Sequence, residues 1–358
     1  MRTMMTRKER FLTAAQARQP DRVPMFDFLF QEPMYESLIG HRPGVYNTKD
    51  AVELALALDH DGLWVPFGGY NGFQPQYLAE NVYVDEWGTT YQHNESAWPI
   101  DAPVEYPIKS REDLKHWKSP DPTLPGRATG IEEFHTLDHD NLALCPGVTG
   151  PFTTCWLLMG YEQICYSLYD DPGLLTELFG ISNAFNMEAA RLSVAAGADA
   201  IWVGDDLGDS RGGFMKLSHF RKYYLPYLDE LISYIDGLGV PSLLHCCGHF
   251  KPFLPDLAQT KIAAIHPMQR TANMDLGWVK ENYGSRFGLI GNIDSSRTLP
   301  FGTPEEVIAE AKEAIEIAAP GGGYVLASDH SLHDGIPLEN ILALRQAGRD
   351  YGWNFYQQ

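Results

Sequence analysis

The stretch Pro241-Ser-Leu-Leu-His-Cys-Cys-Gly-His249 passes from apolar residues to histidine, cysteine and glycine within a few positions. Its first half has the length and the composition of a buried strand. Comparable apolar runs recur along the chain and alternate with longer segments of helical periodicity, which is the pattern of βα units around a parallel sheet. The predicted strands are Val23–Phe30, Gly62–Phe67, Leu142–Val148, Ala200–Asp206, Pro241–Cys247, Ala263–Met268, Arg286–Asp294 and Tyr324–His330.

Eight βα units predict an α/β fold, a TIM-type (β/α)8 barrel, with a β-hairpin inserted near residues 82–91, where apolar and polar residues alternate around a glycine. An open, doubly wound sheet is the weaker alternative, because no Gly-x-Gly-x-x-Gly follows the first predicted strand. No repeat or linker divides the chain, so we expect a single domain over residues 1–358. In a barrel of this type the active site lies where the strands end.

The charge of the chain narrows the class of ligand. Lys and Arg number 27 against 47 Asp and Glu, which gives a formal net charge of −20. Such a charge repels phosphates and anionic lipid surfaces, so we expect a small-molecule substrate and neither nucleic acid nor a membrane as partner. The polar N-terminus has no signal-peptide pattern, and the five cysteines are an odd number. Both features predict a soluble, cytoplasmic protein with free thiols.

Two strand ends carry the side chains that metals prefer. His245 and Cys247 lie two positions apart in an extended segment, so both point to one face and can converge on one ion. Zinc accepts both ligand types, and a catalytic zinc uses three protein ligands. The last predicted strand supplies the third candidate, His330 or Asp329. The alternative is a buried thiol beside a histidine that binds the backbone.

A thiol next to a base also allows a second chemistry. Cys246 or Cys247 could act as a nucleophile activated by His245 or His249. No orienting Asn or Asp partner can be assigned from the sequence, so we rank this interpretation below a metal site. His249 and His266 are reserve metal ligands.

Carboxylates and an amide follow two further strands. Asp205 and Asp206 are neighbours at the end of the fourth predicted strand, so only one of them can point into the barrel mouth, and the other is expected to bind a loop or helix amide. The inward carboxylate could donate a proton, orient a ligating histidine or anchor substrate. The alternative is a turn that includes Gly208. Asn292 and Asp294 form a weaker candidate for substrate binding.

Aromatic residues near the second strand and the hairpin predict the wall of an apolar substrate pocket, although core packing is the more frequent role of such residues. The residues concerned are Trp64, Phe67, Tyr70 and Trp87.

Taken together, the motifs identify a family. Over essentially its whole length the chain resembles the uroporphyrinogen decarboxylase superfamily, which implies the TIM-type barrel already inferred. The motifs that carry the resemblance are Arg7-Lys-Glu-Arg-Phe-Leu-Thr-Ala-Ala15, Pro20-Asp-Arg-Val-Pro24, Asp85-Glu-Trp-Gly88, Gly197-Ala-Asp-Ala200, His245-Cys-Cys-Gly248, Gly291-Asn-Ile-Asp294 and the stretch from Gly323 to Pro337.

The superfamily has two branches, and the sequence departs from the first. The decarboxylases bind a porphyrinogen with N-terminal arginines and with an aspartate on the second strand. Here residues 27–32 contain no arginine, and the second strand ends Trp64-Val-Pro-Phe67 without an aspartate. The second branch resembles zinc methyltransferases that act with a corrinoid protein and bind the metal through His-x-Cys and a distant Cys. His245 and Cys247 match, but His330 stands at the distant position.

The resemblance therefore implies an enzyme, a methyltransferase with zinc on His245, Cys247 and His330, a corrinoid (cobalamin) carried by a partner protein, and a small methylated or methoxylated compound as methyl donor or acceptor. Asp205, Asp206 and His330 are the expected catalytic residues. The exchange of Cys for His at the distant position suggests a methyl donor or acceptor other than that of the coenzyme M enzymes. Two alternatives stay open: a lyase on a smaller carboxylated substrate, and a non-catalytic barrel that binds a corrinoid or tetrapyrrole. A homodimer also stays open.

Overall fold

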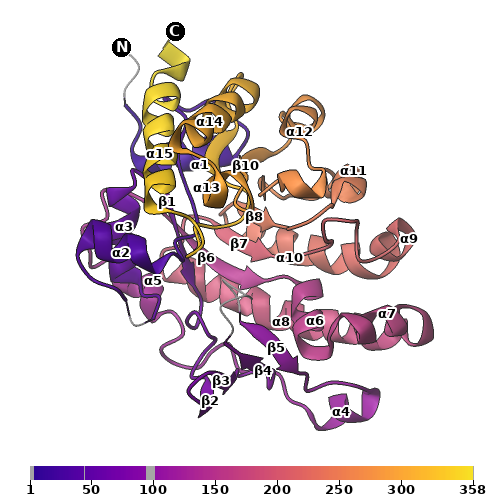
Figure 1. The fold of residues 1–358 in the computed structure, drawn as a ribbon. Coiled ribbons are helices and arrows are strands. Elements are labelled where there is room, and N and C mark those ends of the chain that lie inside the picture. Colours follow the sequence, from indigo (N-terminus) through magenta and orange to yellow (C-terminus); the bar gives the residue numbers. More distant parts are fainter. Residues whose placement is uncertain (1–3, 44, 94–100, 358) are drawn as a thin grey trace.

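The computed structural model describes residues 4–43, 45–93 and 101–357 and shows a curved parallel sheet surrounded by helices (Figure 1). Within these residues the sheet has seven strands in the order β1-β6-β7-β8-β9-β10-β11. All neighbouring strands are parallel, so their carboxyl ends meet at one mouth. The strands are β1 (Gly62–Pro66), β6 (Ala143–Thr149), β7 (Ile201–Gly204), β8 (Ser242–His245), β9 (Ala264–His266), β10 (Gly288–Ile293) and β11 (Tyr324–Ser328).

The first predicted strand, Val23–Phe30, is present but is not a regular strand. It forms isolated parallel bridges from Met25 to Leu326 and from Leu29 to Leu332, and it closes the barrel beside β11. Between these bridges a side chain replaces the backbone acceptor, because the Ser328 N–H donates to Oδ2 of Asp27 at 2.8 Å. A regular ladder needs main-chain partners at each step, so the prediction of a continuous strand here is wrong.

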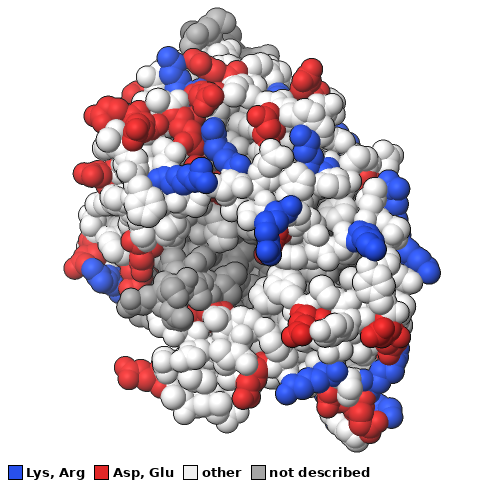
Figure 2. Space-filling view, turned by 45° about the vertical axis from the view of Figure 1, so that its right-hand side comes forward, with Lys and Arg blue, Asp and Glu red and all other residues white. Residues whose placement is uncertain are grey.

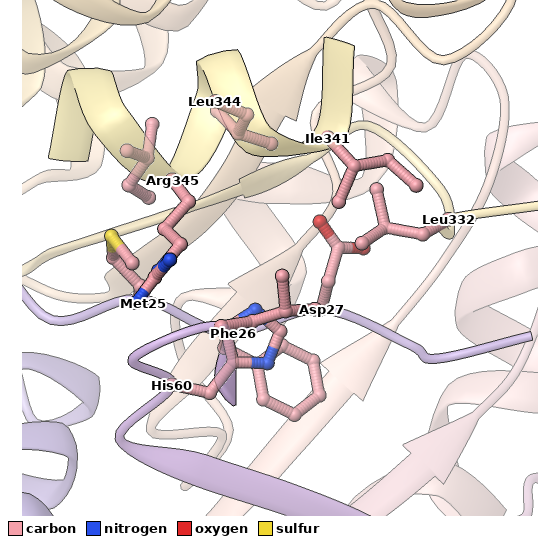
Figure 3. A pocket seen from close by; sticks show the side chains of 10 residues that line it. Met25, Phe26, Asp27, His60, Leu332, Ile341, Leu344 and Arg345 are labelled. Atoms are coloured by element: carbon pink, nitrogen blue, oxygen red, sulfur yellow. The ribbon is translucent and has the colours of Figure 1, made fainter. Parts of the chain in front are cut away.

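Asp27 joins the two ends of the barrel wall. Its Oδ1 accepts a second hydrogen bond, from Oγ of Ser328 at 2.7 Å, and Oγ of Ser328 in turn accepts the His330 N–H at 3.3 Å. Figure 3 shows the Asp27 carboxylate pointing toward Leu332 and Ile341, where a cavity of about 20 Å³ has room for about one water molecule. Burial raises the pKa of Asp27 to about 7.

The predicted hairpin is confirmed and belongs to a larger unit. β3 (Val82–Val84) pairs antiparallel with β4 (Thr90–Gln92), and β2 (Gln76–Ala79) and β5 (Ala102–Glu105) extend the pair to a four-stranded sheet. This sheet follows β1 in the sequence and lies at one end of the barrel (Figure 1). Tyr83 and Tyr91 stack across it with ring centroids 5.2 Å apart.

The helices cover the outside of the barrel. Two of them have clear start signals: α14 begins with the capping box of Thr303 and Glu306, and α15 begins just after Pro337. The helices are α1 (Arg7–Ala15), α2 (Glu32–Ile39), α3 (Thr48–Ala57), α4 (Arg111–His116), α5 (Thr129–Phe134), α6 (Pro151–Met159), α7 (Tyr161–Asp170), α8 (Pro172–Ala195), α9 (Leu217–His219), α10 (Leu225–Gly237), α11 (Leu254–Leu257), α12 (Leu276–Tyr283), α13 (Thr298–Phe301), α14 (Pro304–Ala318) and α15 (Leu338–Ala347).

The helical segment from Leu217 to Gly237 is interrupted. A π-helical turn over Phe220–Tyr224 separates α9 from α10, and Pro226 follows it at the start of α10. Proline lacks the N–H that an α-helix needs and crowds the preceding turn, and a wider turn accommodates it.

The core forms two layers. An inner layer fills the barrel and includes Phe26 and Trp202, whose rings stack 5.2 Å apart. The buried Phe11 of α1 belongs to this layer and caps the barrel at the end opposite the mouth. The larger layer lies between the sheet and the outer helices. No helix in the described part of the chain has the length and apolarity needed to cross a membrane.

We predict that Asp27→Ala lowers the free energy of unfolding by about 1–3 kcal/mol, because it leaves the buried Ser328 N–H without its acceptor. Urea denaturation measures the change. The matched control is Asp236→Ala, which removes an exposed ion pair with Lys261 and should cost less than about 1 kcal/mol. Equal losses in the two variants would contradict the role assigned to Asp27.

Candidate metal centre and active site

The carboxyl ends of β7, β8 and β11 place the candidate residues around the barrel mouth. The strands end earlier than predicted, so His245 is the last residue of β8, and Cys247 and His330 lie in the loops beyond. Gly248 allows the β8 loop to turn, because its φ is +76° and a Cβ there would lie 2.3 Å from the carbonyl oxygen of Gly208. The loop therefore folds back closely over the end of β7.

His245, Cys247 and His330 converge at the mouth. One candidate ligand atom from each lies within 4.8 Å of the other two, and the three form the group of His, Cys, Asp or Glu side chains in the described chain that could hold a metal. Sγ of Cys247 lies 3.2 Å from Nε2 of His245. The rings of His245 and His330 are 5.8 Å apart between centroids, at 80°. One ion bonded at about 2.0–2.3 Å to each atom can bridge such distances.

A second contact orients each imidazole. Nδ1 of His245 lies 2.8 Å from Nδ1 of His266, which is fully buried, and Nδ1 of His330 lies 2.9 Å from Oγ of Ser331. With Nδ1 engaged, each ring keeps Nε2 for a ligand, which is the usual arrangement around bound metals. Asp329, the alternative third ligand, is occupied elsewhere: its carboxylate accepts hydrogen bonds from Ser295 and from the Arg270 N–H.

Burial sets the protonation of the three side chains. It lowers the pKa of His245 to about 4, and burial followed by the charge of His245 lowers the pKa of His330 to about 4. Burial and then the carboxylate of Asp206 raise the pKa of the Cys247 thiol well above its usual range. At neutral pH both imidazoles are therefore neutral, the form that binds metals, and the thiol must lose its proton when a metal binds.

The two adjacent aspartates point to different places. Asp205 is buried and accepts the Thr153 N–H of α6 at 2.6 Å and the hydroxyl of Tyr224 at 2.6 Å. Asp206 is only partly buried, accepts the Cys247 N–H at 2.7 Å and lies 3.8 Å from Nε2 of His245. Burial raises the pKa of both carboxyls, that of Asp205 to about 7. Asp206 is thus the carboxylate beside the candidate metal centre.

A cavity of about 380 Å³ opens at the same mouth, and His245, His330 and Asp206 form part of its wall. Its size suits a small molecule. The aromatic residues selected from the sequence, Trp64, Phe67, Tyr70 and Trp87, all line it.

Asn292 and Asp294 do not line this cavity. The Asn292 side chain is buried and donates to the carbonyl oxygen of Met268 at 3.0 Å. Asp294 accepts the N–H groups of Ser296 and Arg297. Through these contacts Asn292, within β10, and Asp294, just after it, bind backbone groups near the end of the strand.

Comparison with known proteins identifies the family of this chain. The sequence model of uroporphyrinogen decarboxylase (URO-D) matches residues 87–351. The chain belongs to this family. A uroporphyrinogen decarboxylase of Azoarcus sp. (strain BH72) is 27% identical over 261 residues, which cover 69% of this chain and 70% of the relative. The methylcobamide:CoM methyltransferase MtaA of Methanosarcina barkeri is 29% identical over 205 residues, 57% of each chain.

A solved structure confirms the fold of this URO-D family member. A methyltransferase from Methanosarcina mazei superposes with a TM-score of 0.76 at 22% identity, over 97% of this chain and 99% of that chain. The TIM-type barrel predicted from the sequence is thereby confirmed.

Several residues of the site were not selected from the sequence. Phe28, Phe30 and Trp202 line the cavity, and His266, considered only as a reserve ligand, lies behind His245. Phe28 and Phe30 alternate in the first segment, which is the signal for one shared face. The pairing of His245 with His266 has no such signal, because it depends on the register of β8 against β9, where the two residues are opposite each other.

We predict that Gly147→Ala displaces the Trp64 indole from the cavity wall, because a Cβ at Gly147 would lie 2.4 Å from Nε1 of Trp64. Tryptophan fluorescence and near-UV circular dichroism should both change while the far-UV spectrum stays native. The control, Gly212→Ala, adds a methyl group with no atom within 4 Å and should leave the spectra unchanged. Identical spectra for Gly147→Ala and the native protein would show that the wall is not packed as described.

Proposed function

We propose that this URO-D family member is a cytoplasmic, zinc-dependent methyltransferase that moves a methyl group between a small methylated or methoxylated compound and a corrinoid carried by a partner protein. The observation that carries the proposal is the convergence of His245, Cys247 and His330, two of which, His245 and His330, line a cavity of small-molecule size. The relatives named as methyltransferases support the reaction class.

The donor set fits zinc. Two neutral imidazoles and one thiolate are ligand types that zinc accepts, and three protein ligands leave a fourth position for substrate. When bound there, zinc would act as a Lewis acid toward the oxygen or sulfur from which the methyl group departs. A set with one thiolate instead of two places less negative charge on the ion, which increases this acidity.

The two aspartates beside the candidate metal centre have different proposed roles. Asp206 faces the cavity, and its raised pKa suits a carboxyl that supplies a proton to the departing oxygen or sulfur. Asp205 acts through the backbone: it binds the start of α6, and Thr153 of α6 accepts the Asp206 N–H at 3.0 Å. We therefore assign Asp205 a positioning role and Asp206 a proton-transfer role.

The cavity disfavours the decarboxylase reaction. A porphyrinogen with eight carboxylates requires cationic groups to receive it. No Lys or Arg is among the described residues that line this cavity, whereas the carboxylates of Asp85, Asp101 and Asp206 are. The same geometry favours a smaller substrate without several negative charges.

The corrinoid partner must approach the mouth of the barrel. Asp and Glu side chains gather at the upper left of one face, whereas Lys and Arg stand mostly singly on it (Figure 2). Together with the net charge of −20, this distribution favours a partner whose docking surface carries Lys and Arg.

The activity is tested by mixing the zinc-loaded protein with cob(I)alamin and a panel of methoxyarenes and following the formation of methylcobalamin by visible absorption. We expect protein-dependent alkylation that His330→Ala abolishes, because His330 supplies one ligand of the proposed metal centre. Alkylation at the rate seen without protein, together with decarboxylation of uroporphyrinogen, would assign the chain to the other reaction of its family.

We predict about one zinc ion per chain in protein purified without a histidine tag, and less than about 0.2 in Cys247→Ser, which lacks the thiolate ligand. Elemental analysis measures the content. Cys165→Ser is the matched control, because Cys165 is exposed and distant in sequence from the site, and it should retain its zinc. Unchanged zinc in Cys247→Ser would disprove the ligand assignment.

We further predict that zinc affinity rises about tenfold per pH unit between pH 6 and 8, because binding displaces a single proton. The thiol of Cys247 stays protonated in this range without metal, and His245 and His330 are already neutral. Competition with a chelator of known affinity measures the slope. A slope near two protons would show that a histidine is protonated in the free protein, and a flat profile would exclude the thiol as a ligand.

A further inference from the structure

The wall of the 380 Å³ cavity combines aromatic rings with carboxylates. The carboxylates come from Asp85, Glu86, Asp101 and Asp206, and no Lys or Arg side chain is among the lining residues that the structure describes. Among the residues that the structure describes, only Glu86 of these four has a partner of fixed positive charge: it forms a salt bridge with Arg127, whose side chain is 2% exposed. The other three are not neutralised in this way.

The carboxylates of Asp85 and Asp101 have no Lys or Arg partner in the described part of the chain. Asp85 accepts hydrogen bonds from the Trp87 and Thr89 N–H groups and from the Tyr91 hydroxyl, which are all uncharged donors. Oδ1 of Asp101 lies 2.8 Å from Nδ1 of His93, a side chain that is about half exposed to solvent. In a partly desolvated cavity such charges attract cations and repel anions more strongly than in water.

Aromatic rings lie next to these charges at steep mutual angles. Trp64 and Tyr70 have centroids 6.4 Å apart at 85°, and Phe30 meets Trp64 at 5.7 Å and 90°. Tyr70 and Asp101 both line this cavity, so the ring and the carboxylate face the same space. Rings at right angles beside a carboxylate form the kind of box that proteins use to bind organic ammonium groups.

A single ring, that of Phe28, separates this box from the candidate metal centre. Phe28 contacts Trp64 on one side, with centroids 5.7 Å apart, and His245 on the other, at 5.6 Å. A molecule of modest length can therefore place one end among Phe30, Trp64 and Tyr70 and the other beside His245 and His330. A ligand in this cavity meets two distinct environments.

We propose that the cavity selects a small organic cation, with an ammonium group held by Trp64, Tyr70 and Asp101 and with the methylated oxygen or sulfur placed at His245, Cys247 and His330. The methyl-bearing end of this assignment rests on the proposed function, whereas the charge preference rests on the cavity wall alone. This charge is opposite to that of an anionic thiol such as coenzyme M, which is part of the name of the Methanosarcina barkeri methyltransferase.

The test compares three methoxyarenes of nearly equal shape that differ in charge: 4-methoxybenzylammonium, 4-methoxybenzyl alcohol and 4-methoxybenzoate. Their affinities for the zinc-loaded protein are measured by isothermal titration calorimetry at low and high salt. We expect the ammonium compound to bind at least about tenfold more tightly than the benzoate, with the alcohol between them and a smaller spread at high salt. Equal or tighter binding of the benzoate would overturn the proposal, as would binding of none of the three at millimolar concentration.

Two variants distinguish the contribution of the Asp101 carboxylate to binding from general effects of a lost charge. Asp101→Asn should reduce the advantage of the ammonium compound over the alcohol by at least about threefold while leaving the affinity for the alcohol unchanged. Asp236→Asn, an equal loss of charge on the exposed surface, should leave that advantage intact. An unchanged advantage in Asp101→Asn would contradict the role assigned to Asp101.

The cobalt alkylation assay on the same compounds keeps the two proposals apart. Selective binding of the cation without any methyl transfer would refute the methyltransferase function and leave the charge preference standing. Methyl transfer from the benzoate at a rate equal to that from the ammonium compound would refute the charge preference and leave the methyltransferase function standing.

Discussion

The hydrogen bonds between Asp27 and Ser328 are the constraint on which the candidate site depends. They join the irregular first segment to the end of β11 and close the barrel where a regular ladder is missing. Since Ser328 also accepts the His330 N–H, the same contact fixes the backbone at the third candidate ligand. A barrel that closed in another register would carry His330 away from His245 and Cys247, so fold and site share one interaction.

The opposite side of the mouth is fixed by close backbone approach. Gly248 lets the β8 loop pass the carbonyl oxygen of Gly208, and Gly150 leaves space for the Asp205 carboxyl, which a Cβ would meet at 2.2 Å. Asp205 then holds the start of α6, and Asp206 is left facing the cavity beside Cys247. The alternation at the strand end thus points the two neighbouring carboxylates to different surroundings.

The sequence predicted the parts of this account that follow from short-range pattern. The barrel follows from repeated apolar runs, and the meeting of His245, Cys247 and His330 at one mouth follows from their places at strand ends. The failures depend on side-chain hydrogen bonds to the backbone, which the apolar pattern of the sequence does not reveal. The first strand is irregular because the Asp27 carboxylate, in place of a main-chain carbonyl, accepts the N–H of Ser328, 301 positions away. Asn292 donates to the carbonyl oxygen of Met268 and Asp294 accepts the Ser296 N–H, and neither residue lines the cavity. The acidic and aromatic box likewise combines Trp64 of β1 with Asp101, which precedes β5 of the inserted sheet, a juxtaposition that spacing alone does not reveal.

The central claim is that one zinc ion is bound by two imidazoles and one thiolate of this chain. X-ray absorption spectroscopy at the zinc edge tests it most directly, because the spectrum distinguishes nitrogen from sulfur ligands and gives the number of each and their distances from the metal. We predict two nitrogen ligands at about 2.0–2.1 Å, one sulfur at about 2.3 Å and one further light atom. A first shell with two sulfur ligands, or with none, would contradict the account.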